Sequence, residues 1–464
     1  AAGAKRPPRH PHLPIREGKD AISMNRVGRA AAAIALAVAA FTVGAIGVLR
    51  HPGDAASPAA PAPADAAAVA VAPGSSEQAI AQLQQRLREV PGDWNAANAL
   101  GLAYVQQARI TADPSYYPKA EAVLHASLDT HPQENPGAYV GLAALAAARH
   151  DFAGALGDGE RAKRLDPYDG AMYGVIGDAL VELGRYDAAA GALQRMVDTS
   201  PGLSSYARIS YLRELRGDVR GATVAMQAAR DVAGTPADTS WAAYQLGELA
   251  WNSGDVRDAA ARYREASQLD PTWVPPDAGL AKVAWARGAV QRAIARYRDV
   301  VARVPLPEYV VALGDLLWSS GDRAGARQEY GLARAEAALF RANGVDVDLE
   351  LANFDADHGH PRPALRAARA EWARRHSIHV ADAYAWALHA AGRDRAALRY
   401  ERRALALGTR SASFRYHLGM IELALGRREA GAGDLRAALR INPHFSILGS
   451  SVARSALATE RGHT

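Results

Sequence analysis

The segment Asp355-Ala-Asp357-His358-Gly-His360 contains the side chains that are best suited to metal or acid–base chemistry. Two carboxylates and two imidazoles lie within six residues, and donors of this kind suit a divalent metal ion. The competing interpretation is a turn between two helices, because His-Gly is typical of a helix C-terminus and Asp is common in turns. No second pair of ligands follows at helical spacing. We therefore predict no metal site and no catalytic residue here.

The signatures of other enzyme chemistries are missing from the sequence. The chain has no cysteine, which excludes disulfides, thiolate zinc sites and a cysteine nucleophile. It also has no glycine-rich phosphate loop, no serine-nucleophile motif and no His-Glu-x-x-His pair. We therefore predict a protein that is not an enzyme and needs no cofactor.

Tryptophans recur at a nearly constant interval in the middle of the chain. Trp251, Trp285 and Trp318 are 34 and 33 residues apart. Prolines follow the same interval, since Pro167 and Pro201 are 34 residues apart, as are Pro271 and Pro305. A fixed period of this length indicates a chain built from repeated structural units.

Small residues recur within each unit at matching positions, for example Gly247, Gly254 and Ala259, and then Gly314, Gly321 and Ala326. With this spacing the sequence resembles the tetratricopeptide repeat family. In that family the small residues let two antiparallel helices touch, a glycine makes the turn between them, and a proline begins the next unit.

The resemblance extends over about residues 77–449. It implies an all-α fold, a right-handed superhelical solenoid of about ten helix-turn-helix repeats at 77–445, with a capping helix and tail at 446–464. The expected repeats are 94–134, 136–169, 170–203, 203–236, 240–273, 274–306, 307–340, 345–378, 378–411 and 412–445. The eighth repeat departs from the pattern, with His360-Pro361-Arg362-Pro363 where a plain turn is expected.

The resemblance also implies a binding surface, because in the family the first helix of each repeat lines a concave groove. The family register places eight candidate residues there: Trp241, Tyr244, Glu248, Trp251, Lys282, Trp285, Asp315 and Trp318. Glu308 adds a nearby charge. Flat aromatic faces suit extended peptides and also sugar rings. The competing interpretation is that these tryptophans pack between neighbouring helices.

The N-terminal quarter has a different character. We expect a disordered basic tail at 1–28, a membrane-spanning segment at 29–50 and an Ala/Pro linker at 51–76. Residues 30–49 carry no charge, and twenty helical residues would cross a bilayer core of about 30 Å. A cleaved signal segment starting near Met24 is the alternative. Both place the repeats outside the cytoplasm, because basic residues precede the apolar segment.

The distribution of charge along the sequence bears on whether the protein binds nucleic acid. The net charge is +5, but residues 361–464 hold 18 Arg against 8 acidic residues. These arginines alternate with Ala, Leu and acidic residues, so we interpret them as solvated helix faces and expect no nucleic-acid partner.

The predicted function is a non-enzymatic protein-interaction scaffold, membrane-tethered or exported, that binds a protein or peptide in its groove. The alternative is a cell-envelope polysaccharide-binding or export accessory protein.

Overall fold

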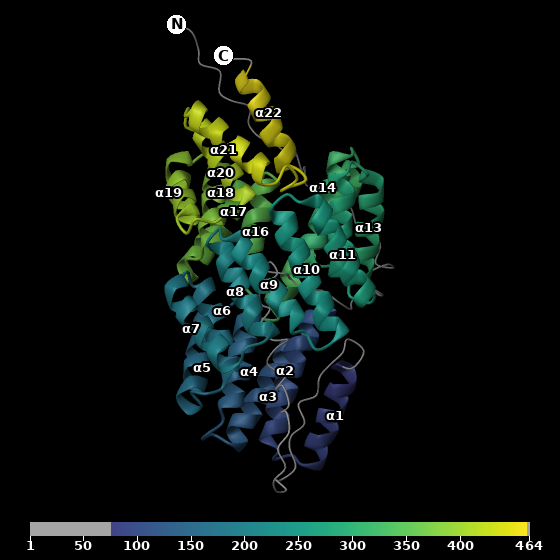
Figure 1. Ribbon diagram of the computed structural model, residues 1–464, viewed down its shortest axis with the longest axis vertical. Coiled ribbons are helices and arrows are strands. Elements are labelled where there is room, and N and C mark those ends of the chain that lie inside the picture. Colours follow the sequence, from purple (N-terminus) through teal and green to yellow (C-terminus); the bar gives the residue numbers. More distant parts are fainter. Residues whose placement is uncertain (1–75, 462–464) are drawn as a thin grey trace.

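The computed structural model describes residues 76–461, and this part of the chain is helical throughout, without strands (Figure 1). Ten consecutive helix pairs follow α1 (Ser76–Glu89) and precede α22 (Gly449–Arg461). The predicted all-α solenoid of helix-turn-helix repeats is confirmed. The segments predicted as tail, membrane span and linker lie outside the described residues, apart from Ser76.

The ten pairs fall close to the predicted repeat boundaries. They are α2 (Trp94–Thr111) and α3 (Tyr116–Thr130), α4 (Pro136–Ala148) and α5 (Phe152–Leu165), α6 (Gly170–Glu182) and α7 (Tyr186–Thr199), α8 (Leu203–Leu215) and α9 (Val219–Asp231), α10 (Pro236–Asn252) and α11 (Val256–Leu269), α12 (Pro275–Ala286) and α13 (Val290–Arg303), α14 (Pro307–Ser319) and α15 (Arg323–Ala342), α16 (Asp348–Asp357) and α17 (Pro361–Arg374), α18 (Ile378–Ala390) and α19 (Asp394–Leu405), and α20 (Ala412–Ala424) and α21 (Arg428–Ile441).

The turn inside several pairs is encoded by a Gly-Asp dipeptide. Gly254 has φ +82°, a left-handed conformation that glycine adopts without steric cost, and it ends α10. Asp255 then caps α11, since its carboxylate accepts hydrogen bonds from the backbone N–H groups of Arg257 and Asp258. The dipeptide therefore stops one helix and starts the next.

Small residues allow successive pairs to pack closely. The fully buried Tyr263 ring of α11 lies between Gly247 of α10 and Gly279 of α12. A Cβ atom at Gly247 would lie 2.6 Å from the ring, and one at Gly279 would lie 2.7 Å from it. The recurring glycines therefore make room for one aromatic side chain from the second helix of the pair.

The solenoid coils back onto itself, so that its second turn rests on its first. Asn442 Nδ2 donates to the carbonyl oxygen of Trp251 at 2.7 Å, across 191 residues of sequence. The backbone N–H of Ile378 donates to the Tyr186 hydroxyl at 2.7 Å, across 192 residues. Figure 1 shows α17 to α20 beside α6 to α8 accordingly. This offset is between five and six repeats of about 34 residues.

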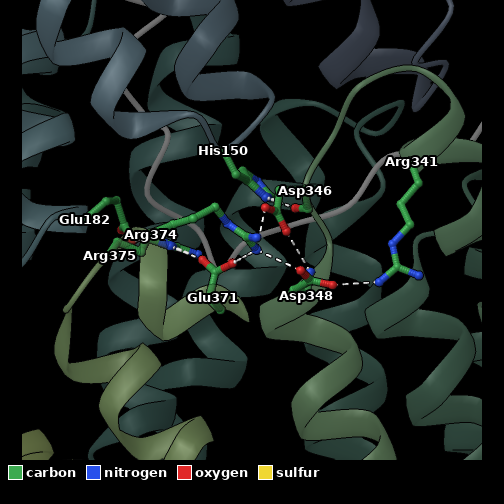
Figure 2. Close-up of polar contacts among 8 residues, drawn as sticks. All are labelled: His150, Glu182, Arg341, Asp346, Asp348, Glu371, Arg374 and Arg375. Carbon is green, nitrogen blue, oxygen red and sulfur yellow. Dashed lines mark hydrogen bonds and ion pairs between the residues drawn. The ribbon is translucent and has the colours of Figure 1, made fainter. Parts of the chain in front are cut away.

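Charged side chains reinforce this contact between turns (Figure 2). The network consists of His150, Glu182, Arg341, Asp346, Asp348, Glu371, Arg374 and Arg375. Arg375 is almost fully buried, and it forms ion pairs with Glu371 of its own helix region and with Glu182 of the first turn. Arg374 approaches Asp346, Asp348 and Glu371 at 2.5, 2.8 and 2.6 Å. The network therefore joins α6 to the segment from α15 to α17.

No helix within residues 76–461 is both long enough and apolar enough to cross a bilayer.

Candidate functional site

The closed superhelix surrounds an internal space that we call the lumen. It consists of two cavities of about 380 and 760 Å³, whose walls share Trp251, Glu308, Glu350, Asp357 and Phe445. Most of the wall comes from first helices, namely α8, α10, α12, α14, α16, α18 and α20, and the segment before α22 completes it. The lumen is therefore lined mainly by the helices that the family resemblance expects to face a groove.

Five of the eight predicted site residues meet in this lumen. Trp251 and Trp285 have ring centroids 6.5 Å apart, and both line the smaller cavity. Lys282 Nζ lies 5.3 Å from the Trp251 ring and 2.6 Å from the Glu248 carboxylate. Asp315 lines both cavities. The stacking of first helices brings these side chains together, because they recur at the same position of successive repeats.

The other three predicted residues lie elsewhere. Trp241 is buried and packs among Ala207, Met226 and Leu246 in the interface between repeats. Tyr244 packs against Tyr263 and Trp273, with ring centroids 5.7 and 5.2 Å away.

Trp318 is half-buried beneath the guanidinium of Arg323, which lies 3.5 Å from the ring centroid. Neither cavity includes Trp241, Tyr244 or Trp318 in its wall. The tryptophan series therefore contributes two neighbouring rings to the lumen rather than a continuous ladder of three.

The Asp355–His360 segment ends α16 and begins α17, as the turn interpretation predicts. Its side chains have separate partners. Asp355 pairs with Arg334 at 2.5 Å, and Asp357 accepts a hydrogen bond from the Trp386 indole at 2.8 Å. His358 Nε2 lies 2.9 Å from Asp315 Oδ1. These residues do not converge on one point.

Asp315 and His358 instead form a small polar cluster on the lumen wall. The Tyr330 hydroxyl donates to Asp315 Oδ1 at 2.8 Å, and the Tyr330 and His358 rings have centroids 4.4 Å apart. Burial alone would lower the pKa of His358, but the hydrogen bond and charge of Asp315 outweigh it, so the pKa is raised. The cluster holds the Asp315 carboxylate at a fixed place in the wall.

Acidic side chains dominate the charge of the lumen. Among the described residues, six lining carboxyl groups have no ion pair with lysine or arginine: Glu214, Glu308, Asp315, Glu350, Asp357 and Asp382. Lys282, the lining lysine, is already paired with Glu248, and Arg220 and Arg410 line the larger cavity only. The carboxyl groups of the lumen therefore outnumber its basic side chains, most clearly in the smaller cavity, where four of them lie next to aromatic surface.

Burial of these carboxyl groups changes their titration. Desolvation raises the pKa of Glu214 and of Glu308 to about 7, and it raises the pKa of Glu350 to about 8. Neither carboxylate oxygen of Glu350 meets a hydrogen-bond donor from another described residue. A cation placed among these groups would replace protons and restore the charged form.

Sequence reasoning missed Glu214, Glu350 and Asp382 as parts of this surface. Glu214 lies in the last turn of α8, within the predicted repeat 203–236, so the family register could have been applied to it, while Glu350 lies in the irregular eighth repeat. Asp382 lies in α18, the first helix of the predicted repeat 378–411, so the expectation that first helices line the groove could have indicated it.

Comparisons with known proteins agree with the repeat architecture. Residues 278–338 match the family described as tetratricopeptide repeat. This range runs from α12 into α15 and includes Lys282, Trp285 and Asp315. A search of curated protein sequences finds no match.

Several solved structures are similar to parts of this chain. A thermophilic tetratricopeptide repeat protein of Thermus thermophilus has 22% identity and a TM-score of 0.34, covering 38% of this chain and 92% of that one. Yeast Tom70 has 13% identity and a TM-score of 0.35, covering 84% and 86%. A human IFIT1 dimer with PPP-AAAA has 16% identity and a TM-score of 0.44, covering 72% and 78%. At these values we draw nothing about ligands from them. The family match and the ten helix pairs support a protein built from tetratricopeptide-type repeats.

Proposed function

We propose that this protein is a non-enzymatic scaffold that binds an extended, positively charged segment of a partner protein inside its lumen. The observation that carries this proposal is the set of lumen carboxyl groups that lack lysine or arginine partners among the described residues. Glu308 and Glu350 belong to this set, and both face the smaller cavity beside Trp251 and Trp285.

The size and lining of the lumen suit such a segment. The smaller cavity, about 380 Å³, is lined by aromatic rings and four carboxyl groups, which match the methylene stem and charged head of a lysine or arginine side chain. Arginine and ammonium groups also gain energy over tryptophan faces. Successive side chains of an extended segment would enter the smaller and then the larger cavity.

Short unstructured peptides with equal apolar content but opposite net charge would test the proposal. We expect the basic peptides to bind the full chain in a fluorescence anisotropy titration and the acidic peptides to fail. Trp285→Ala should weaken binding by tenfold or more, since a buried aromatic anchor contributes about 2 kcal/mol. Glu308→Gln should also weaken peptide binding relative to the wild type, and its effect should be larger at high pH. Asp187→Asn is the control, because that side chain is fully exposed outside the lumen.

Other results would redirect the interpretation. Equal binding of acidic and basic peptides would remove the electrostatic argument, and normal binding by Trp285→Ala would remove the lumen as the site. Envelope polysaccharides belong in the same assay as the alternative ligands. The polysaccharide-binding function replaces the proposed peptide-binding function if two results are found together. Polysaccharides change the tryptophan fluorescence of the wild type but not that of Trp285→Ala, and the basic peptides change neither.

We also propose that the repeats lie outside the cytoplasm, held by residues 29–50 as a membrane anchor or released after cleavage there. The uncharged stretch between Arg29 and Arg50 and the basic residues before it support this placement. Cell fractionation followed by protease treatment of spheroplasts tests it. Full-length protein in the membrane fraction that is digested from outside supports an anchor, and shortened soluble protein in the periplasm or medium supports a cleaved signal. Protein protected in the cytosol contradicts both.

A further inference from the structure

A second cluster of side chains lies on the far wall of the lumen, where three consecutive helices meet. Asp382 of α18, Glu401 of α19 and His417 of α20 place their ligand atoms within 4.8 Å of one another. Glu401 is completely buried, and Asp382 and His417 are nearly so. Asp382 and His417 also line the larger cavity, so the cluster can be reached from the lumen.

The Glu401 carboxyl group lacks a counter-charge. Neither of its oxygens meets a hydrogen-bond donor among the described residues, although the residue is 0% exposed. Arg415, the basic residue whose charge acts on Glu401, forms no ion pair with it and is engaged with Asp434 at 2.8 Å. Burial and the neighbouring Asp382 raise the pKa of Glu401 far above its ordinary range. Two facing carboxyl groups in such a place require a shared proton or a bound cation.

His417 is held in a fixed orientation beside these carboxyl groups. Its ring stacks on Trp386, with centroids 4.2 Å apart and planes inclined by 17°. His417 Nδ1 lies 2.7 Å from Asp382 Oδ1. The Trp386 indole is anchored in turn by its hydrogen bond to Asp357. Supporting contacts of this kind orient metal ligands in known sites.

The geometry points to a binding site for a divalent transition-metal ion, formed by Asp382, Glu401 and His417, with its open coordination positions facing the lumen. Two carboxylate oxygens and one imidazole nitrogen suit zinc or manganese. Three protein ligands leave at least one position for water or for a group on a bound partner. Binding requires only that the ion replace protons held by the cluster.

Another acidic cluster shows why this one differs. Asp346, Asp348 and Glu371 also lie close together. In that cluster Arg374 occupies the centre and approaches all three carboxylates within 2.8 Å. The arginine supplies the positive charge there, whereas the Glu401 cluster has no equivalent side chain among the described residues.

The test uses the full chain without an affinity tag, after chelation and dialysis. Zinc is titrated by calorimetry, and cobalt is titrated with visible spectroscopy, because Co²⁺ absorption reports protein ligands directly. We expect one site per chain in the wild type, and at least tenfold weaker binding with a lost or altered cobalt spectrum in Glu401→Gln. His417→Gln should behave similarly. Glu336→Gln is the matched control, since Glu336 is also buried without a hydrogen-bond partner among the described residues but belongs to no such cluster.

The outcomes separate a metal site from a shared proton. Glutamine at position 401 can still donate to Asp382, so Glu401→Gln should fold, and circular dichroism verifies this. Absence of zinc and cobalt binding in the wild type, or equal binding in wild type and Glu401→Gln, would overturn the metal site and leave the proton-sharing pair. Peptide binding in the lumen is measured separately, so it can succeed or fail independently of this result.

Discussion

Substitution of Arg375 by methionine tests the contact between superhelical turns. The Arg375 side chain is 2% exposed and pairs with Glu371 and Glu182, which are 3% and 11% exposed. Removing one member of a buried ion pair costs about 3–5 kcal/mol, because the partner keeps its charge without compensation. Glu371 would retain Arg374, whereas Glu182 would lose its ion-pair partner. We therefore expect a loss near the lower end, about 3 kcal/mol.

Urea unfolding followed by circular dichroism measures this loss, combined with hydrogen exchange to locate it, because long repeat arrays can unfold in parts. Exchange should accelerate in α6 and in α17, which lie far apart in sequence. Arg341→Met is the control, because that side chain is half exposed and its surface pair with Asp348 should contribute no more than about 1 kcal/mol.

A second variant separates charge from packing. Glu182→Met combined with Arg375→Met removes both charges of the cross-turn pair, and it should recover part of the lost stability because buried pairs can be replaced by apolar groups at little cost. If Arg375→Met and Arg341→Met destabilise the chain equally, or if the first change costs less than about 1 kcal/mol, the cross-turn ion pair does not hold the superhelix closed.

Three further predictions concern the turns and the lumen. Gly217→Ala should destabilise the chain more than Gly288→Ala in urea unfolding. Both glycines are left-handed, with φ of +75° and +77°, but a Cβ atom at Gly217 would lie 2.2 Å from the Gly408 carbonyl oxygen, whereas Gly288 has open space around it. Equal losses of stability would mean that the two superhelical turns do not touch at Gly217. Burial raises the pKa of Glu350 from its ordinary value of 4.5 to about 8, so between these pH values the folded state binds more protons than the unfolded state. The free energy of unfolding should therefore fall as the pH rises through this range, and Glu350→Gln should reduce the fall. Denaturation at several pH values measures both. Basic peptides bind the deprotonated carboxyl groups, so their affinity should rise between pH 6 and 8.5 in wild type and rise less in Glu350→Gln, as titrations at fixed ionic strength would show; an affinity independent of pH contradicts this coupling.

The sequence predicted the repeat architecture well because that information is local. The prolines at 34-residue intervals and the small residues at matching positions recur from unit to unit, so each helix pair could be placed from its own sequence. The constant repeat interval also places Trp251, Trp285 and Lys282 on the same surface. These features depend on contacts between adjacent repeats only.

The rest could not be predicted because it depends on the curvature of the superhelix. Arg375 and Glu182 are 193 residues apart, and no pattern in the sequence links them. Trp241 was predicted in the groove from the family register, but it packs between repeats, and Trp318 lies outside the cavity walls. Small rotations of each pair, added over several repeats, decide which side chains reach the lumen.

The most direct test of the central claim is site-specific photo-crosslinking with the basic peptide of highest affinity. A photoreactive residue replaces either Val311, which lines the smaller cavity, or Val224, which is 66% exposed and outside both cavities. If the lumen is the binding site, the peptide crosslinks from position 311 and not from position 224, and excess unlabelled peptide suppresses the product. Crosslinking from position 224 alone, or equally from both positions, would contradict a partner segment bound inside the superhelix.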